Sequence, residues 1–330
     1  MNLNPGRDSW AIKKKLNVND TISEFRLADW SALQLASVEQ ALNRWVACPA
    51  NEPVPAGLAD LNLAMRYAVL DGGKRLRPLL VLAACEAVNG RPQAALRAAC
   101  AVELIHAYSL VHDDMPCMDN DVLRRGKPTV HIKFGEAQAM LAGDALQALA
   151  FEFLTPDDDT LPVATQAQLC RMLARAAGGQ GMAGGQAIDL ASVGFPLTSE
   201  QLHDMHRLKT GALLQASVLM GATCGAASVP VMNALRDYGA AIGLAFQVVD
   251  DILDVTADSA TLGKTAGKDA AQHKPTFVSL MGLEASTEYA QQLLARALDS
   301  LNTIDTLQPD GLHSTHALHA LADMLVNRTH

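Results

Sequence analysis

The segment 113–127 carries four carboxylates followed at once by three cations: Asp113, Asp114, Asp119, Asp121, Arg124, Arg125 and Lys127. Carboxylates this close repel one another and usually need a cation between them. Oxygen ligands without a neighbouring cysteine pair favour Mg²⁺ or a similar hard ion over zinc. Metal ions beside guanidinium groups are suited to binding a phosphate or diphosphate. The alternative is a solvated acidic loop, because charged runs are usually exposed.

A second acidic cluster lies far downstream, at the end of Phe246–Asp254. Its order is Asp-Asp-x-x-Asp, and Asp250 and Asp254 are one turn apart, so they share a helix face. The preceding residues are apolar, and a carboxylate that projects from a buried helix is costly without a cation. Lys264 and Lys268 follow, as the arginines follow the first cluster. The repeated pattern indicates a diphosphate held by bridging metal ions between two facing helices.

A third charged site follows two glycines. Gly72-Gly73 allows a tight turn and a close approach to a ligand. It brings Lys74, Arg75 and Arg77 to the start of the next helix, where backbone N–H groups already favour an anion. The positive end of the helix dipole repels cations there, and a bound anion would offset that repulsion. The alternative is a basic turn that faces solvent.

Helices, predicted from the pattern of apolar residues, must position the charged side chains of these three sites. Apolar positions recur at helical intervals over most of the chain. The predicted helices are 31–46, 58–70, 79–88, 92–114, 133–154, 165–182, 199–219, 231–255, 286–301 and 313–327. No run alternates with period 2 in β-branched residues, so no sheet is predicted. The fold class is all-α, a large single-domain helical bundle around a central cavity.

The predicted helix 92–114 places Glu103, His106, Ser109 and Asp113 on one face, because side chains three and four apart align. Asp113 and Asp119 are six apart, which on a straight helix puts them about 120° out of register. Pro116 cannot continue the helix. The chain can therefore fold back there and bring both carboxylates to one metal cluster.

Composition excludes several classes of function. The net charge of −9 over 330 residues argues against a nucleic-acid partner. The six cysteines have no regular spacing, which fits reduced thiols, and we expect a cytoplasmic protein. Residues 1–30 lack an apolar signal core and are expected to form a poorly ordered leader. Residues 211–235 are uncharged but rich in Gly and Ala, so we expect a buried helix and no stable membrane insertion.

The motifs together resemble the trans-isoprenyl diphosphate synthase family. The likeness rests on Gly72–Pro78, Asp113–Asp119 with Arg124-Arg125, Gly184–Asp189, Lys209-Thr210, Phe246–Asp254 and Lys264–Lys268. It runs in order from about residue 31 to the C-terminus, so 31–330 is expected to form an isoprenoid synthase domain. Val122 is a small departure, because similar relatives often carry another aspartate there.

The resemblance implies an elongation cavity with three Mg²⁺ ions that binds isopentenyl and allylic diphosphates. It implies metal ligation by Asp113, Asp119 and Asp250, with Asp114, Asp251 and Asp254 as supporting candidates. The allylic diphosphate would contact Arg124, Lys209, Gln247 and Lys264. Isopentenyl diphosphate would contact Lys74, Arg77, His106 and Arg125. Which of Asp250, Asp251 and Asp254 bind metal directly stays open.

The implied chemistry begins with ionisation of the allylic C–O bond, because metal ions and cations neutralise the leaving diphosphate. The carbocation would lie beside carbonyl and hydroxyl dipoles, for which the family candidates are Lys209, Thr210 and Gln247. Isopentenyl diphosphate then attacks in a fixed orientation. The released diphosphate takes the proton in the family's mechanism.

Product length in this family depends on side chains just before the first aspartate. Tyr108 lies five residues before Asp113, and Ser109 lies one turn before it. Similar relatives with one aromatic there make the fifteen-carbon product. The resemblance therefore implies a transferase, a farnesyl diphosphate synthase, with geranyl or geranylgeranyl diphosphate synthase as the alternative. The family is usually dimeric, so we expect a homodimer, for which 211–235 could supply the interface.

Four other functions compete with this one. A terpene cyclase would normally have a differently patterned second metal site and no isopentenyl site, and a silent partner subunit would tend to have lost an acidic motif. His112-Asp113 could belong to a metal hydrolase, but a second suitable histidine pair is lacking. Gly179-x-Gly181-x-x-Gly184 matches a dinucleotide fingerprint, but no strand precedes it, which indicates helix packing.

Overall fold

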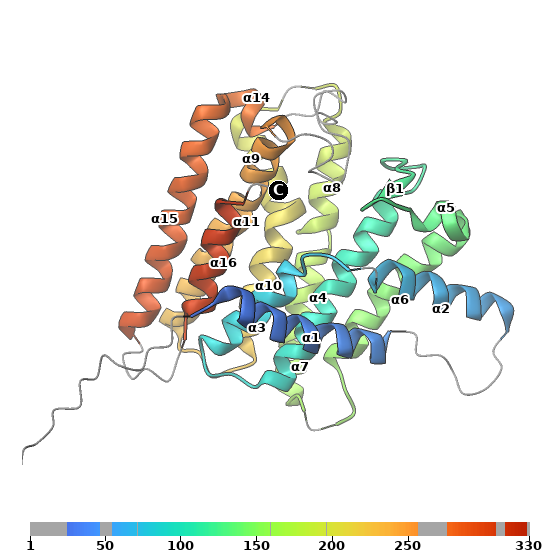
Figure 1. The fold of residues 1–330 in the computed structure, drawn as a ribbon, viewed down its shortest axis with the longest axis horizontal. Helices are drawn as coiled ribbons and strands as arrows, with labels where there is room; N and C mark the ends of the chain where they lie inside the picture. The colour runs from blue at the N-terminus through green and yellow to red at the C-terminus, as the bar shows by residue number, and fades with distance from the viewer. Residues whose placement is uncertain are drawn as a thin grey trace, which may run out of the picture.

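The structure is a computed structural model that describes residues 25–46, 55–70, 72–158, 160–195, 197–256, 276–307 and 314–328. Lys264 and residues 1–24 lie outside this range. The helices are α1 (Leu27–Trp45), α2 (Ala56–Val69), α3 (Leu76–Glu86), α4 (Pro92–Asp113), α5 (Val130–Phe134), α6 (Glu136–Leu154), α7 (Val163–Ala177), α8 (Met182–Ala191), α9 (Ser199–His206), η1 (Arg207–Gly211), α10 (Ala212–Thr223), α11 (Val229–Thr256), α14 (Phe277–Met281), α15 (Leu283–Leu307) and α16 (His316–Val326). Figure 1 shows their arrangement.

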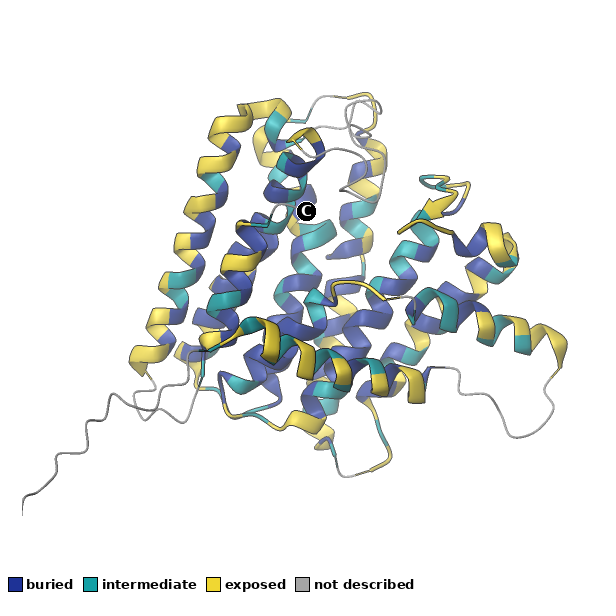
Figure 2. Cartoon of the chain, viewed as in Figure 1, coloured by how far each residue is buried: buried dark blue, intermediate teal, exposed yellow. Residues whose placement is uncertain are grey.

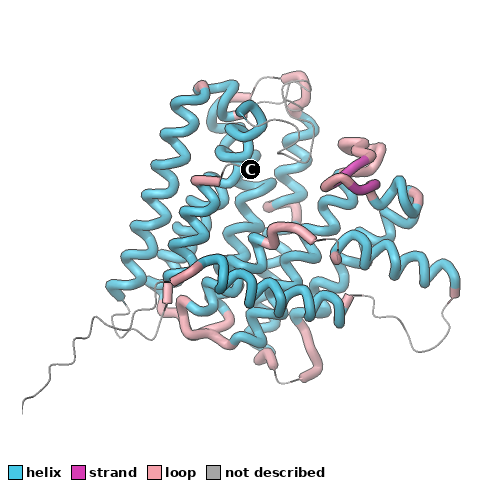
Figure 3. The backbone as a smooth tube through the Cα atoms, in the orientation of Figure 1, coloured by secondary structure: helices cyan, strands magenta, loops and turns pink. Residues whose placement is uncertain are grey.

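The predicted all-α class is confirmed, with one small correction. A two-stranded hairpin, β1 (Leu123–Arg124) and β2 (Lys127–Pro128), follows the first acidic cluster, and Figure 3 shows it beside the helices. Arg125 and Gly126 make its turn with φ of 53° and 77°. Period-2 alternation cannot reveal strands of two residues, so this hairpin could not be predicted from the sequence pattern.

Several predicted helices differ from the observed ones at their ends or in their interior. Helix α1 begins at Leu27, so the boundary at residue 30 is wrong by a few residues, and the Trp30 indole donates to Glu86 at 2.9 Å. Gly135, with φ of 88°, separates α5 from α6 where one helix was predicted. The predicted helix 199–219 is continuous, but its middle turn, η1, is a π-helix.

The core lies around α4, α10 and α11. Most residues of α10 are buried, whereas α15 has one exposed face, as Figure 2 shows. Most of α10 is thus packed within the chain, as predicted for a buried helix, whereas Ala226 and residues 228–230, which follow it, are exposed. That 211–235 supplies a subunit interface stays a prediction. Among the described helices only α4 is long and apolar enough to cross a membrane, and 72% of its apolar window is buried in the protein.

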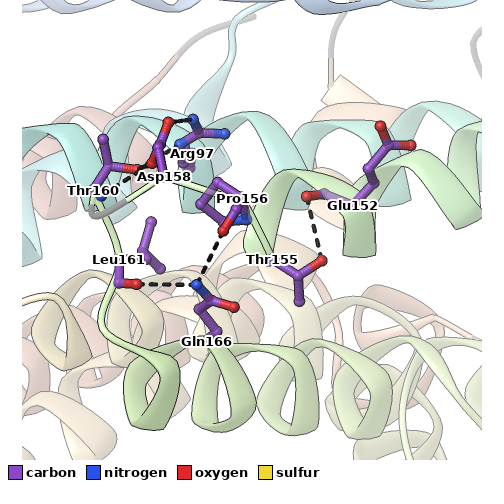
Figure 4. Close-up of polar contacts among 8 residues, drawn as sticks. All are labelled: Arg97, Glu152, Thr155, Pro156, Asp158, Thr160, Leu161 and Gln166. Carbon is purple, nitrogen blue, oxygen red and sulfur yellow. Dashed lines mark hydrogen bonds and ion pairs between the residues drawn. The ribbon is translucent and has the colours of Figure 1, made fainter.

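The connection between α6 and α7 is fastened to the start of α4. Figure 4 shows Arg97 reaching across to this loop, where it donates to Asp158 at 2.8 Å and to Thr160 at 3.1 Å. Gln166 of α7 donates to the carbonyls of Pro156 and Leu161. These contacts tie together the ends of α4, α6 and α7 that lie away from the acidic cluster.

Candidate active site

The first acidic cluster folds back on itself at the end of α4. The helix ends at Asp113, and the backbone N–H of Asp119 donates to the Asp113 carbonyl at 2.9 Å. Asn120 N donates to Met115 O at 3.1 Å, which closes a loop around Pro116. The break at Pro116 was predicted, and it brings Asp119 to Asp113 as expected.

One carboxylate of each acidic cluster, Asp113 and Asp250, lines a cavity of about 550 Å³, which we call the acidic cavity. Asp113 comes from α4 and Asp250 from α11, so the carboxylates lie on two walls. The other predicted residues that line it are Arg77, His106, Tyr108, Ser109, Arg124, Arg125, Lys209, Thr210 and Gln247. Residues that are far apart in the sequence therefore meet in one site.

Asp114 lies in a different environment from Asp113. It is 3% exposed and pairs with Arg124, whose Nη2 lies 2.6 Å from Oδ1 and whose Nε lies 2.9 Å from Oδ2. In this structure Asp114 therefore orients a guanidinium at the cavity wall. The next residue, Arg125, lies in the hairpin turn, and its side chain donates to the Gly72 carbonyl instead of to Asp114.

The second cluster divides into one accessible and two buried carboxylates. Asp250 lines the acidic cavity and pairs with Arg328, a residue that sequence reasoning missed. Asp251, 2% exposed, accepts from Gln247 Nε2 and from Phe277 N, both at 2.8 Å. Asp254 is 5% exposed. Of the three, Asp250 has the access that a metal ligand needs.

Lys209 and Thr210 reach the cavity from the π-helical turn η1. Such turns are frequent at functional sites because they re-aim side chains within a helix. Lys209 Nζ lies 2.5 Å from Asp189 of α8, and Thr210 donates to Gln247 Oε1 at 3.2 Å. Asp189 was recognised only as part of a motif, and its ion pair now gives it a positioning role.

Gly185 keeps α8 close to this turn. A Cβ added there would lie 2.5 Å from Lys209 Cα and 2.7 Å from Lys209 Cβ. We expect Gly185→Ala to push η1 away and to lower kcat roughly 10- to 100-fold, since a misplacement of about 1 Å can have that effect. The control is Gly179→Ala, where a Cβ meets nothing within 4 Å. Steady-state kinetics test this, and an unchanged kcat in Gly185→Ala would refute the packing argument.

A second cavity of about 1090 Å³ adjoins the first and is lined by the four residues assigned to isopentenyl diphosphate: Lys74, Arg77, His106 and Arg125. We call it the basic cavity. Burial holds the pKa of His106 well below its ordinary value, and Arg77 and Arg125 lower it further. Burial also lowers the pKa of Arg77, whose Nε has no hydrogen-bond partner among the described residues. This concentration of positive charge suits an anion.

Arg75 does not belong to that anion site. It is 5% exposed, has φ of 46° and points into the protein. Its guanidinium donates to Glu39, Glu103 and the Val69 carbonyl at 2.6 to 2.7 Å. The prediction that all three cations at the start of α3 face an anion is therefore wrong for Arg75, because Glu103 provides a buried partner.

The donor set fits a hard cation. Asp113 and Asp119 are close enough for the charge of Asp119 to raise the pKa of Asp113, and all the candidate ligands are carboxylates. A bound cation would relieve the repulsion between the Asp113 and Asp119 carboxylates. No group of three His, Cys, Asp or Glu side chains among the described residues is already gathered as a metal cluster. The two walls therefore present ligands that a cation would have to bridge.

The titration of Asp113 predicts how cation binding depends on pH. Burial raises its pKa to about 6, with Asp119 adding to the shift and Lys209 opposing it. Because the folded pKa exceeds the unfolded one, the group's contribution to stability is full below about pH 4 and is lost as the pH rises through 6. Mg²⁺ needs the carboxylate, so its apparent affinity should fall by up to about tenfold per unit below pH 6. Calorimetric titration with Mg²⁺ at pH 5 to 8 tests this, and equal affinities at pH 5 and pH 7 would contradict it.

Comparison with known proteins agrees with the site. The family model described as polyprenyl synthetase matches residues 59–307. A protein of Sinorhizobium fredii named "Probable farnesyl diphosphate synthase" is 50% identical over 276 residues, covering 82% of this chain and 81% of its own length. The large subunit 1 of a heterodimeric chloroplastic geranylgeranyl pyrophosphate synthase of Arabidopsis thaliana is 47% identical over 290 residues, covering 86% and 76%.

A solved structure shares the fold. The geranyltransferase of Helicobacter pylori, crystallised with magnesium and isoprenyl diphosphate, superposes with a TM-score of 0.78 at 35% identity, covering 92% of this chain and 99% of that one. The similarity thus extends over nearly the whole of both chains. With its two acidic walls, its basic cavity and these matches, the chain belongs to the polyprenyl synthetase family.

Proposed function

We propose that this protein is a prenyltransferase that condenses isopentenyl diphosphate with dimethylallyl and geranyl diphosphates to give (2E,6E)-farnesyl diphosphate. The observation that carries the proposal is the contact between the two cavities, which share Arg77, His106, Arg125 and Phe246. Two anionic substrates can therefore meet with their diphosphates on different sets of cations. The names of its relatives support the same reaction class.

Each wall has a separate task in this reaction. Mg²⁺, which we propose as three ions held by Asp113, Asp119 and Asp250, would neutralise the leaving diphosphate. Arg124 and Lys209 add fixed positive charge at the same cavity, each oriented by a carboxylate, Asp114 or Asp189. These preoriented charges stabilise the charge that develops on the leaving group.

The remaining groups guide the second substrate and the cation. Lys74, Arg77 and His106 line the basic cavity and would hold isopentenyl diphosphate in a fixed orientation. Thr210 and Gln247 are hydrogen-bonded to each other and present oxygen dipoles to the acidic cavity, where the allylic carbocation would form. We further propose a cytoplasmic homodimer.

The direct test is product analysis. The purified protein with Mg²⁺, dimethylallyl diphosphate and radiolabelled isopentenyl diphosphate should give a linear fifteen-carbon diphosphate. A cyclic or dephosphorylated product would favour a terpene cyclase, and no product at all would favour a silent subunit. A twenty-carbon main product would support the second candidate, a geranylgeranyl diphosphate synthase, which the Arabidopsis relative brings forward.

Tyr108 should limit the chain length. Its ring is buried, and it lines the acidic cavity near the end of α4. We expect Tyr108→Ala to raise the proportion of twenty-carbon and longer products roughly tenfold when isopentenyl diphosphate is in excess, which is the scale of discrimination by apolar pockets. Thin-layer chromatography of the products measures this. An unchanged distribution would show that Tyr108 does not close the cavity.

A further inference from the structure

The ring of Tyr108 packs against a second ring on the same helix. His112 lies one turn further along α4, with ring centroids 5.8 Å apart and an interplanar angle of 73°. Edge-to-face packing of this kind is favourable beyond the area it buries. Both rings line the acidic cavity. The position of Tyr108 therefore depends on where His112 is held.

Helix α6 holds His112. Its Nε2 lies 3.1 Å from the Met140 carbonyl, and because a carbonyl only accepts, Nε2 carries the hydrogen. Gly143 lies beneath the imidazole. A Cβ there would be 2.5 Å from His112 Cδ2 and closer still to Nε2, so any other residue would displace the ring. A glycine weakens a helix relative to alanine, and here it provides the space that the imidazole occupies.

The same helix also lies near the phenol of Tyr108. Burial raises the pKa of Tyr108, and the side-chain amide of Gln147 opposes that shift. Met140, Gly143 and Gln147 are spaced three and four apart, so they lie on one face of α6 and meet α4 together. The Tyr108 ring is thus packed against His112, and His112 is held in turn by the Met140 carbonyl of α6.

We infer that His112 and Gly143 are specificity-determining positioning residues, which fix the Tyr108 ring at the end of the cavity and so set the product length. This inference rests on the proposed prenyltransferase function. The imidazole occupies the space between Gly143 and the Tyr108 ring. Pushing it from the α6 side narrows the cavity, and removing it frees the Tyr108 ring to turn aside.

Two substitutions should therefore shift the products in opposite directions. His112→Ala should raise the ratio of twenty- to fifteen-carbon product about 2- to 10-fold, the range expected when an aromatic pair is lost. Gly143→Ala should move the imidazole into the cavity and raise the ratio of ten- to fifteen-carbon product by a similar factor. A variant that merely loses activity would form less of every product, and the two product ratios would not shift in opposite directions.

The double variant tests the contact itself. If Gly143 acts only through the imidazole, Gly143→Ala should have no further effect on the product ratio in a His112→Ala background. His112→Gln can still donate to the Met140 carbonyl but lacks the ring, and it should resemble His112→Ala. The control is Gly57→Ala on α2, where a Cβ meets nothing within 4 Å and the distribution should stay as in the wild type.

The outcomes separate this inference from the proposed function. If the wild type forms no linear prenyl diphosphate, the proposed function fails. If the wild type forms farnesyl diphosphate and His112→Ala and Gly143→Ala give the same distribution as the wild type, only the inference fails. If His112→Ala does not fold, as judged by circular dichroism, Gly143→Ala and His112→Gln decide it by the same readout.

Discussion

Replacing Asp113 by asparagine is expected to lower kcat by about three orders of magnitude. Loss of a single preoriented electrostatic group in an active site commonly lowers kcat 10²- to 10³-fold. Asp113 would hold a metal ion that directly stabilises the negative charge developing on the leaving diphosphate. Asp113 is the last residue of α4, and it lines the acidic cavity together with Asp250 of the other wall. Asparagine has the same shape but no charge, so the effect should be electrostatic and not due to packing.

The measurement is kcat for fifteen-carbon product together with calorimetric Mg²⁺ binding. Asp250→Asn should reduce both in the same way, because it presents the other wall. Asp237→Asn is the matched control, since Asp237 is an exposed aspartate on α11, the helix that carries Asp250. Full activity of Asp113→Asn at saturating Mg²⁺ would refute the proposal that metal ions bind between Asp113 and Asp250.

Replacing Arg75 by methionine should destabilise the fold strongly and leave Glu103 as a buried, unpaired charge. Both side chains are at most 5% exposed and their atoms lie 2.7 Å apart. Removing one partner of a buried pair costs about 3 to 5 kcal/mol. The midpoint of thermal unfolding should fall by roughly 4 to 7 °C in a chain of 330 residues.

A second substitution should recover much of that loss. In Arg75→Met with Glu103→Leu, neither charge remains buried, and replacement of a whole buried pair by apolar groups is often close to neutral. Arg97→Met breaks a far more exposed pair with Asp158 and should shift the midpoint little. Differential scanning calorimetry of the wild type and the three variants measures this. A double variant less stable than Arg75→Met would contradict the explanation.

The sequence predicted the parts of the site that depend on local geometry. A proline beyond the first turn cannot continue a helix, so the end of α4 before Pro116 and the return of Asp119 to Asp113 followed from chain stereochemistry alone. The approximate extents of α4 and α11 followed from apolar periodicity over long segments. The roles of the residues came from resemblance, since spacing does not show which anion a cation binds.

Contacts between distant segments could not be predicted. Nothing near Arg75 in the sequence shows that Glu39 and Glu103 will surround it, and so it looked like its neighbour Lys74. The pairing of Lys209 with Asp189 depends on how closely α8 packs on η1, which Gly185 permits. Arg328 had no local signal at all, because its partner Asp250 is 78 residues away.

The place of Arg328 has a practical consequence for handling the protein. The residue follows α16, donates to the Phe246 carbonyl at 3.2 Å and stacks over the Phe246 ring with its Cζ 4.4 Å from the centroid. A purification tag or fluorescent fusion added after residue 330 would begin two residues beyond this contact. Such an addition would start close to the wall of the basic cavity, which Arg328 lines. Kinetic comparisons among variants should therefore use protein from which any carboxy-terminal tag has been removed.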